Sequence, residues 1–189
     1  MSAVDAVYLA TQHIVVKGAL ISAQRVTDKA GEHVLVLSHK SGPSPSEPSE
    51  REEYHELNAV YYGHNDGRWK PDWTIHDMVD CPTLDSAAEF FTSAVSITDL
   101  NGDGRSEVTI PYRLFCSGSI DYSTVKVILR DGGTKLAIRG ELEMYQPDGK
   151  PALQGKKQYD QALLQPANSI YKQHLDAIWA RIKLVKNDS

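Results

Sequence analysis

The sequence predicts an α+β fold: mainly an antiparallel β-sheet, with one amphipathic helix near the C-terminal end packed on it. Three observations support this prediction. Runs of β-branched and aliphatic residues recur through the middle of the chain, turn-forming residues separate them, and helical periodicity is convincing only near the end. With 189 residues, 41% of them hydrophobic, we expect one globular domain, residues 1–189, with a substantial core.

The strands are expected to pair with their sequence neighbours. The turn-former HNDG separates the second run from the third, and DGG at 131–133 separates the last two. Residues up to about 25 suit either a strand or a short helix. The strand-like runs are 33–39, 57–63, 69–79, 93–99, 106–115, 123–130 and 134–145.

Between the first two runs lies SGPSPSEPSEREE, residues 41–53. Its Pro, Ser, Gly and Glu residues cannot form a core of their own. We expect a flexible surface loop that a protease cuts first.

The C-terminal stretch ANSIYKQHLDAIWARIKLV is expected to be helical, with Asn168 or Ser169 as the N-cap. Its apolar side chains recur at spacings of three and four residues, which places them on one face. That face should pack on the sheet. Its members are Ile170, Tyr171, His174, Leu175, Ile178, Trp179, Ile182 and Val185.

The segment DLNGDGRSE, residues 99–107, concentrates acidic residues between two expected strands, where their charges would repel one another. Calcium prefers six to eight oxygen ligands held by a tightly turned backbone. Gly102 and Gly104 allow the positive φ angles that such a turn demands. The expected Ca²⁺ ligands are Asp99, Asn101, Asp103, the backbone carbonyl of Arg105, and Glu107. The alternative is an Asx-rich hairpin turn without metal.

This loop is not an EF-hand, because the bidentate Glu expected eleven residues after Asp99 would fall at Ile110 and the flanks indicate strands. The loop instead resembles the calcium loop of integrin-type β-propeller repeats, which also joins two strands. The likeness covers about ten residues, and the chain shows no repeat of the motif.

Two cysteines, Cys81 and Cys116, are too few for a four-cysteine zinc site and too far apart for a CxxC motif. A disulfide between them would stabilise the fold by about 3–4 kcal/mol in an oxidising compartment. The alternative is a pair of buried free thiols.

Residues 33–140 resemble an uncharacterised bacterial family labelled as surface polysaccharide biosynthesis proteins. The resemblance is carried by WTIHDMVDCPTLD, ITDLNGDGRSEV, YRLFCSG and TKLAIRG, in the family's order. It implies that Cys81 and Cys116 recur together. Asn101 replaces a family Asp, which implies weaker calcium binding. The family has no established chemistry. Its label implies polysaccharide work, but this sequence shows no sugar-nucleotide site.

Composition argues against several function classes. The net charge is −5 and the basic residues are scattered, which is unlike a nucleic-acid binder. No apolar run approaches the roughly 20 residues of a transmembrane helix, and the opening residues do not resemble a signal peptide. The sequence shows none of the common catalytic or nucleotide-binding motifs.

Two further groups of residues could bear on function. Asp77, Asp80, Asp85 and Glu89 could furnish a glycosidase-type carboxylate pair, although solvated or turn-capping acids explain them as well. A Cys116 nucleophile would be lost on pairing with Cys81. The aromatic residues Tyr61, Tyr62, Trp69 and Trp73 could contact a partner or pack in the core.

The sequence therefore favours a non-catalytic, calcium-binding module that is periplasmic or secreted and acts on a protein partner. An inhibitor or immunity-type protein is one form of this function. The alternative is a hydrolase of cell-envelope glycan.

Overall fold

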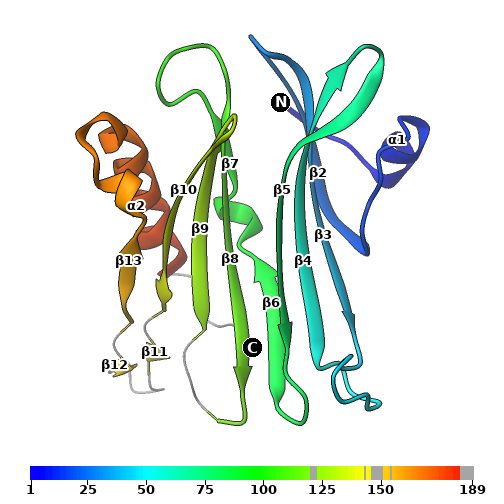
Figure 1. The fold of residues 1–189 in the computed structure, drawn as a ribbon, viewed down its shortest axis with the longest axis vertical. Helices are drawn as coiled ribbons and strands as arrows, with labels where there is room; N and C mark the ends of the chain where they lie inside the picture. Colours follow the sequence, from blue (N-terminus) through cyan, green and yellow to red (C-terminus); the bar gives the residue numbers. More distant parts are fainter. Residues whose placement is uncertain (120–122, 143, 146–150, 154, 184–189) are drawn as a thin grey trace. The chain divides into compact units, whose positions relative to one another are not determined.

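The computed structural model describes residues 1–119, 123–142, 144–145, 151–153 and 155–183. They are mostly antiparallel sheet with one longer helix near the C-terminal end, as predicted (Figure 1). The chain forms two compact units. The first comprises Met1–Ala88 and Asp103–Arg105, and the second comprises the remainder.

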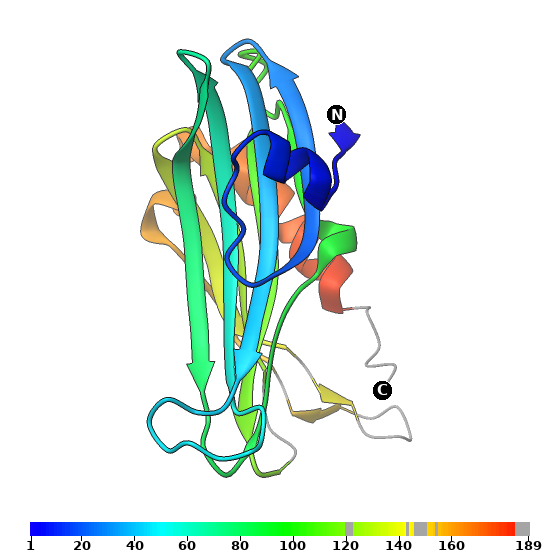
Figure 2. The same ribbon diagram turned by 90° about the vertical axis from the view of Figure 1, so that its right-hand side faces the viewer.

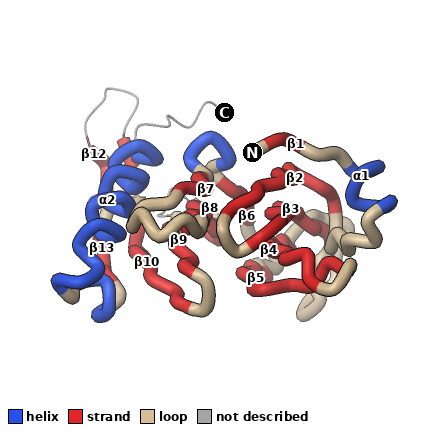
Figure 3. The backbone as a smooth tube through the Cα atoms, turned by 90° about the horizontal axis from the view of Figure 1, so that it is seen from above, coloured by secondary structure: helices blue, strands red, loops and turns tan. Residues whose placement is uncertain are grey.

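The first unit contains a five-stranded sheet whose strands follow one another in chain order (Figure 3). Each strand is antiparallel to its neighbours, so the predicted meander is confirmed. The predicted turn between residues 64 and 67 is a hairpin, because Asn65 pairs with Arg68. The strands are β1 (Ser2–Ala3), β2 (Ala19–Asp28), β3 (Gly31–Gly42), β4 (Tyr54–Asn65) and β5 (Arg68–Asp80).

The ambiguous N-terminal segment contains both a helix, α1 (Ala6–Thr11), and strand β2. Asp5 caps α1 by accepting a hydrogen bond from the Tyr8 N–H at 2.8 Å. Leu9 is buried with Ile14 in a cluster that also takes in side chains from three strands of the sheet. The helix therefore covers one face of the first sheet (Figure 2).

The second unit contains most of a six-stranded sheet, in which five strands follow one path and the sixth, β7, lies off it. The path is β13 (Lys157–Tyr159), β10 (Thr134–Glu141), β9 (Thr124–Asp131), β8 (Glu107–Ser117) and β6 (Asp85–Phe90). Strand β7 (Ser96–Thr98) also pairs with β8, and β11 (Met144–Tyr145) pairs with β12 (Pro151–Leu153). The chain passes from the first unit into the second within β6.

Helix α2 (Ser169–Lys183) packs on the second sheet, as its periodicity predicts. Short 3-10 turns lie at Thr92–Ala94, Gln161–Leu164 and Pro166–Asn168. The first of them replaces the start of the strand expected at 93–99. Ile170 is 42% exposed rather than buried, and Val185 lies outside the described residues. The buried α2 residues are Tyr171, Leu175, Ile178, Trp179 and Ile182.

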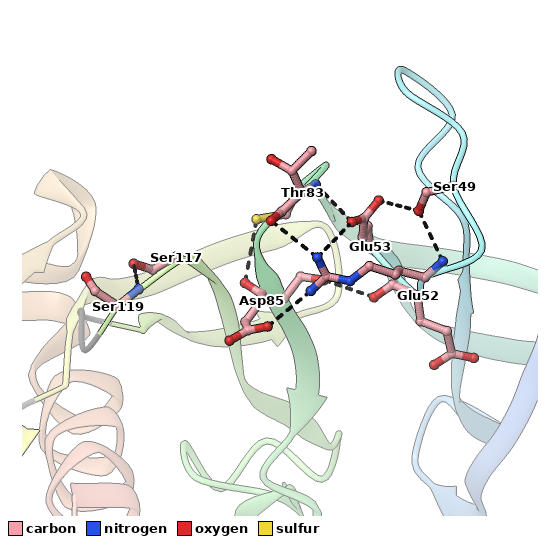
Figure 4. Close-up of polar contacts among 10 residues, drawn as sticks. Ser49, Glu52, Glu53, Thr83, Asp85, Ser117 and Ser119 are labelled. Atoms are coloured by element: carbon pink, nitrogen blue, oxygen red, sulfur yellow. Dashed lines mark hydrogen bonds and ion pairs between the residues drawn. The ribbon is translucent and has the colours of Figure 1, made fainter.

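The segment 41–53, expected to be a flexible loop, has contacts of its own in the structure. Its first two residues extend β3, and Ser44 and Glu53 are buried. The carboxylate of Glu53 accepts hydrogen bonds from Ser49 Oγ at 2.8 Å and from the Thr83 N–H at 2.9 Å (Figure 4). Flexibility of the remaining residues stays a prediction.

Thr83 adopts a left-handed backbone conformation, with φ of 68°. Pro82 precedes it, and the Leu84 N–H donates to the Cys81 carbonyl at 3.4 Å, which closes a four-residue turn. A β-branched residue is strained in this conformation. Its main-chain bonds to Glu53 and Arg51 hold it there.

We predict that Thr83→Gly stabilises the protein by about 1 kcal/mol, because glycine adopts positive φ without strain and keeps both main-chain hydrogen bonds. Urea unfolding measures the change. Thr83→Ala retains a Cβ and should gain less. A glycine variant that unfolds at lower urea than the wild type would contradict the strain argument.

Asp176 anchors the outer face of α2 to β13. Its carboxylate pairs with Lys157 and Lys172 and accepts a hydrogen bond from the Tyr159 hydroxyl at 2.8 Å. Partial burial raises the pKa of Asp176, but these three partners outweigh it together and lower the pKa from 3.8 to about 2. The charged form is therefore favoured in the folded protein.

We predict that Asp176→Asn destabilises the protein by about 1 kcal/mol at neutral pH, after allowance for solvent screening of a partly exposed group. A carboxyl whose folded pKa is lowered contributes stability above its unfolded pKa and loses it as the pH falls towards the folded value. The wild-type advantage should therefore vanish between pH 4 and pH 2. Chemical unfolding at several pH values tests this, and an advantage that is unchanged across that window would contradict it.

Candidate metal centre

The acidic loop predicted to bind calcium connects β7 to β8. Thr98 pairs with Glu107 across the antiparallel ladder, so the loop spans a hairpin between two strands. Ile110, where an EF-hand would have its last ligand, is fully buried in β8. The strand flanks predicted from the sequence are therefore confirmed.

Two aspartates shape the backbone of this loop. Asp99 Oδ1 accepts a hydrogen bond from the Gly102 N–H at 2.8 Å, and Asp103 Oδ1 accepts one from the Arg105 N–H at 2.8 Å. Each is an Asx-type bond from a side chain to the backbone a few residues ahead. The loop thus has the local geometry that either alternative from the sequence requires.

Both glycines of the loop have positive φ, 77° at Gly102 and 86° at Gly104. This agrees with the role predicted for them. At Gly104 a side chain would also meet the Lys29 side chain at 3.1 Å. The Gly104 carbonyl accepts a hydrogen bond from the Lys29 N–H at 2.8 Å, which fixes the tip of the loop.

Three of the predicted ligands converge. Asp99, Asp103 and Glu107 each offer one carboxylate oxygen, and these oxygens lie within 4.8 Å of one another. Two oxygens bound to one calcium ion at about 2.3–2.6 Å lie no more than roughly 5 Å apart. The three carboxylates could therefore hold one metal ion without a large rearrangement.

Glu107 distinguishes this cluster from a group of exposed acids. Asp99 and Asp103 are exposed, but Glu107 is fully buried at the first position of β8. Its Oε2 accepts a hydrogen bond from the Leu100 N–H at 2.6 Å. Its Oε1 is buried and has no hydrogen-bond partner among the described residues. A buried carboxylate oxygen in that state is unfavourable unless a cation or proton compensates it.

The electrostatics of the site agree with this description. Burial raises the pKa of Glu107, and the nearby carboxylates of Asp131 and Asp99 raise it further. The Leu100 N–H opposes them. Without a cation, the folded protein therefore disfavours the ionised form of Glu107, which is the form that binds a metal ion.

The other two predicted ligands are exposed. Asn101 donates a hydrogen bond from its side-chain nitrogen to the Tyr171 hydroxyl at 3.0 Å, and that hydroxyl donates to Asp131 Oδ2 at 2.9 Å. Arg105 offers only its backbone carbonyl. Tyr171 and Asp131 were not predicted to belong to the site, because their positions in the sequence indicated a helix core and a turn.

Both cysteines are disulfide-bonded. Since the chain has two cysteines, the bond joins Cys81 to Cys116, and the first of the two alternatives is confirmed. Because Cys116 is disulfide-bonded, it has no thiolate and cannot act as the nucleophile considered above.

The aromatic residues considered for a partner surface lie mainly in the interior. Tyr61, Tyr62 and Trp73 are buried. Trp69 is partly buried and packs against the cluster under α1. Tyr61 and Tyr62 are consecutive in β4 and therefore point to opposite faces of the sheet, Tyr62 into the cluster under α1 and Tyr61 onto the ring of Trp73. A role of these rings in binding a partner stays a prediction.

Three of the four acids of the hydrolase alternative, Asp80, Asp85 and Glu89, have partners that suit structural roles. Asp85 pairs with Arg51, and Glu89 pairs with Arg113. Hydroxyl groups of Ser44 and Ser46 lower the pKa of Asp80, whereas a general acid needs a raised pKa.

In the described part of the chain, no helix is long and apolar enough to cross a membrane.

Comparison with protein-family models, with curated proteins and with solved structures finds no significant match.

We predict opposite effects of Glu107→Gln with and without calcium. In chelator at pH 7 the variant should be at least as stable as the wild type, because a carboxyl with a raised folded pKa loses stability as the pH rises through that pKa. In millimolar calcium it should be about 1–2 kcal/mol less stable, because the amide is a weaker ligand. Urea unfolding in both buffers measures this. The same loss of stability in both buffers would make Glu107 an ordinary core residue.

Proposed function

We propose that this protein is a calcium-stabilised, non-catalytic binding module of the bacterial periplasm or the extracellular space. The observation that carries the proposal is the buried Oε1 of Glu107, which has no hydrogen-bond partner among the described residues and belongs to the converging carboxylates. A bound cation would compensate this oxygen and the repulsion between Asp99, Asp103 and Glu107 together.

Calcium suits the donors better than other common metals. The loop offers carboxylate, amide and backbone oxygens, which are hard ligands, and its sequence DLNGDGRSE contains neither His nor Cys. Magnesium demands near-ideal octahedral geometry and keeps its waters, so a loop that offers several protein oxygens without that geometry favours the larger ion. We expect an affinity of the extracellular kind, with a Kd of about 10⁻⁴ M or somewhat tighter.

The disulfide supports the compartment in this proposal. Disulfides persist in the periplasm and outside the cell and are rare in the cytosol. A weak calcium site also requires millimolar calcium, and that concentration is an extracellular condition. A protein in this setting would use the ion to fix its fold rather than to sense calcium.

The partner is proposed to be a protein, and the module to act as an inhibitor or immunity-type protein that neutralises a secreted toxin. The net charge of −5 would favour a basic partner. The structural partners of Asp80, Asp85 and Glu89 support a non-catalytic role. Turnover of envelope glycan by the purified protein, lost in Asp80→Ala or Asp85→Ala, would instead favour the hydrolase.

We predict that calcium raises the melting temperature by several degrees. A ligand that binds only the folded state adds about 2.7 kcal/mol at a hundred times its Kd. Differential scanning calorimetry in chelator and in calcium measures the shift. Asp103→Ala should abolish it, whereas Glu50→Ala, which removes an exposed acid outside the loop, should retain it. Equal melting temperatures of the wild type in both buffers would refute the proposal.

A further inference from the structure

Tyr171 connects the candidate calcium loop to helix α2. It lies near the start of the helix, and its ring belongs to the core cluster of the second unit, with only 7% of the residue exposed. Because the ring is held by this packing, its hydroxyl has a fixed position. That hydroxyl contacts Asn101 of the loop and Asp131 at the end of β9.

The direction of each hydrogen bond follows from the chemistry of the three groups. A phenol donates the single proton that it carries and accepts through its oxygen. The Tyr171 hydroxyl donates that proton to Asp131 Oδ2. The phenol oxygen then accepts a hydrogen bond, and only the nitrogen of the Asn101 amide can donate one.

This chain of two hydrogen bonds sets the orientation of the Asn101 amide. With its nitrogen directed at Tyr171, the amide oxygen is directed to the other side. Calcium binds the oxygen of such an amide and not the nitrogen. A flipped amide would present the wrong atom to the ion and would place an oxygen against the phenol oxygen.

We propose that Tyr171 is a positioning residue of the calcium site: its hydroxyl, anchored by Asp131, orients Asn101 for the ion and couples ion binding to the docking of α2. The inference rests on the proposed calcium function. It adds residues from α2 and β9 that make no contact with the ion themselves. Groups of this kind, behind the direct ligands, tune metal affinity.

The coupling has a reciprocal consequence. If Tyr171 makes the loop bind calcium more tightly, then bound calcium must hold Tyr171 and the start of α2 more firmly by the same factor. Calcium should therefore slow hydrogen exchange in the first turns of α2, although the ion lies in a different segment of the chain. Removal of the hydroxyl should remove this effect.

The test compares calcium affinities by isothermal titration calorimetry. Tyr171→Phe keeps the packed ring and loses only the hydroxyl, and we expect calcium to bind about five- to tenfold more weakly. The matched control is Tyr62→Phe. Tyr62 is also a buried tyrosine, and its hydroxyl donates to the Val15 carbonyl at 2.7 Å in the first unit rather than to a group that holds α2, so its loss should leave the affinity unchanged.

A double-mutant cycle shows whether Tyr171 acts through Asn101. Asn101→Ala should weaken calcium binding, and Tyr171→Phe should cause no further loss in that background. Hydrogen exchange of α2 should respond to calcium in the wild type and not in Tyr171→Phe. A general structural defect would lower the melting temperature without producing this pattern.

The outcomes separate the two proposals. Wild-type affinity in Tyr171→Phe, or fully additive losses in the cycle, would overturn the positioning role and leave the calcium function standing. The absence of any calcium binding by the wild type would overturn both. Weaker binding in Tyr171→Phe, with Tyr62→Phe unchanged, would support the coupling.

Discussion

The candidate site depends on the burial of one carboxylate. Glu107 begins β8 with its side chain fully buried, and one of its oxygens has no hydrogen-bond partner among the described residues. Such a group is unfavourable in a core, so a fold that keeps it must gain something in return. A divalent cation held by Glu107 together with Asp99 and Asp103 would provide that compensation, and it would make the folded state dependent on the ion. The disulfide and the anchoring of helix α2 add stability to the fold that does not depend on the ion.

Much of the fold follows from local sequence signals. The runs of apolar residues around 33–39 and 57–63 predict strands because β-branched side chains fit a pleated, half-buried surface. The spacing of Leu175, Ile178 and Ile182 predicts the buried face of α2. The N-terminal segment could not be assigned, since a six-residue helix carries too few periodic positions to be distinguished from a strand. Strand β6 was missed because its sequence, DSAAEF, lacks β-branched residues and depends on pairing for its form.

The candidate site was predictable in part, because its donors lie within nine consecutive residues with regular spacing. The burial of Glu107 was not, since exposure depends on packing that the local sequence does not determine. Tyr171 and Asp131 were missed for a related reason: they come from separate elements, and only the fold brings them to Asn101. For the four aromatic residues the sequence left core packing and partner contact open; three of them are buried and Trp69 is partly buried, because burial is decided by packing that the local sequence does not determine.

A crystal structure of the protein grown in millimolar calcium, with the ion located by its anomalous scattering, tests directly whether Glu107 and its neighbours hold calcium. We predict one strong peak at about 2.3–2.6 Å from Glu107 Oε1 and from carboxylate oxygens of Asp99 and Asp103. A map without a peak in this loop, with Glu107 Oε1 still lacking any partner, would contradict the calcium site.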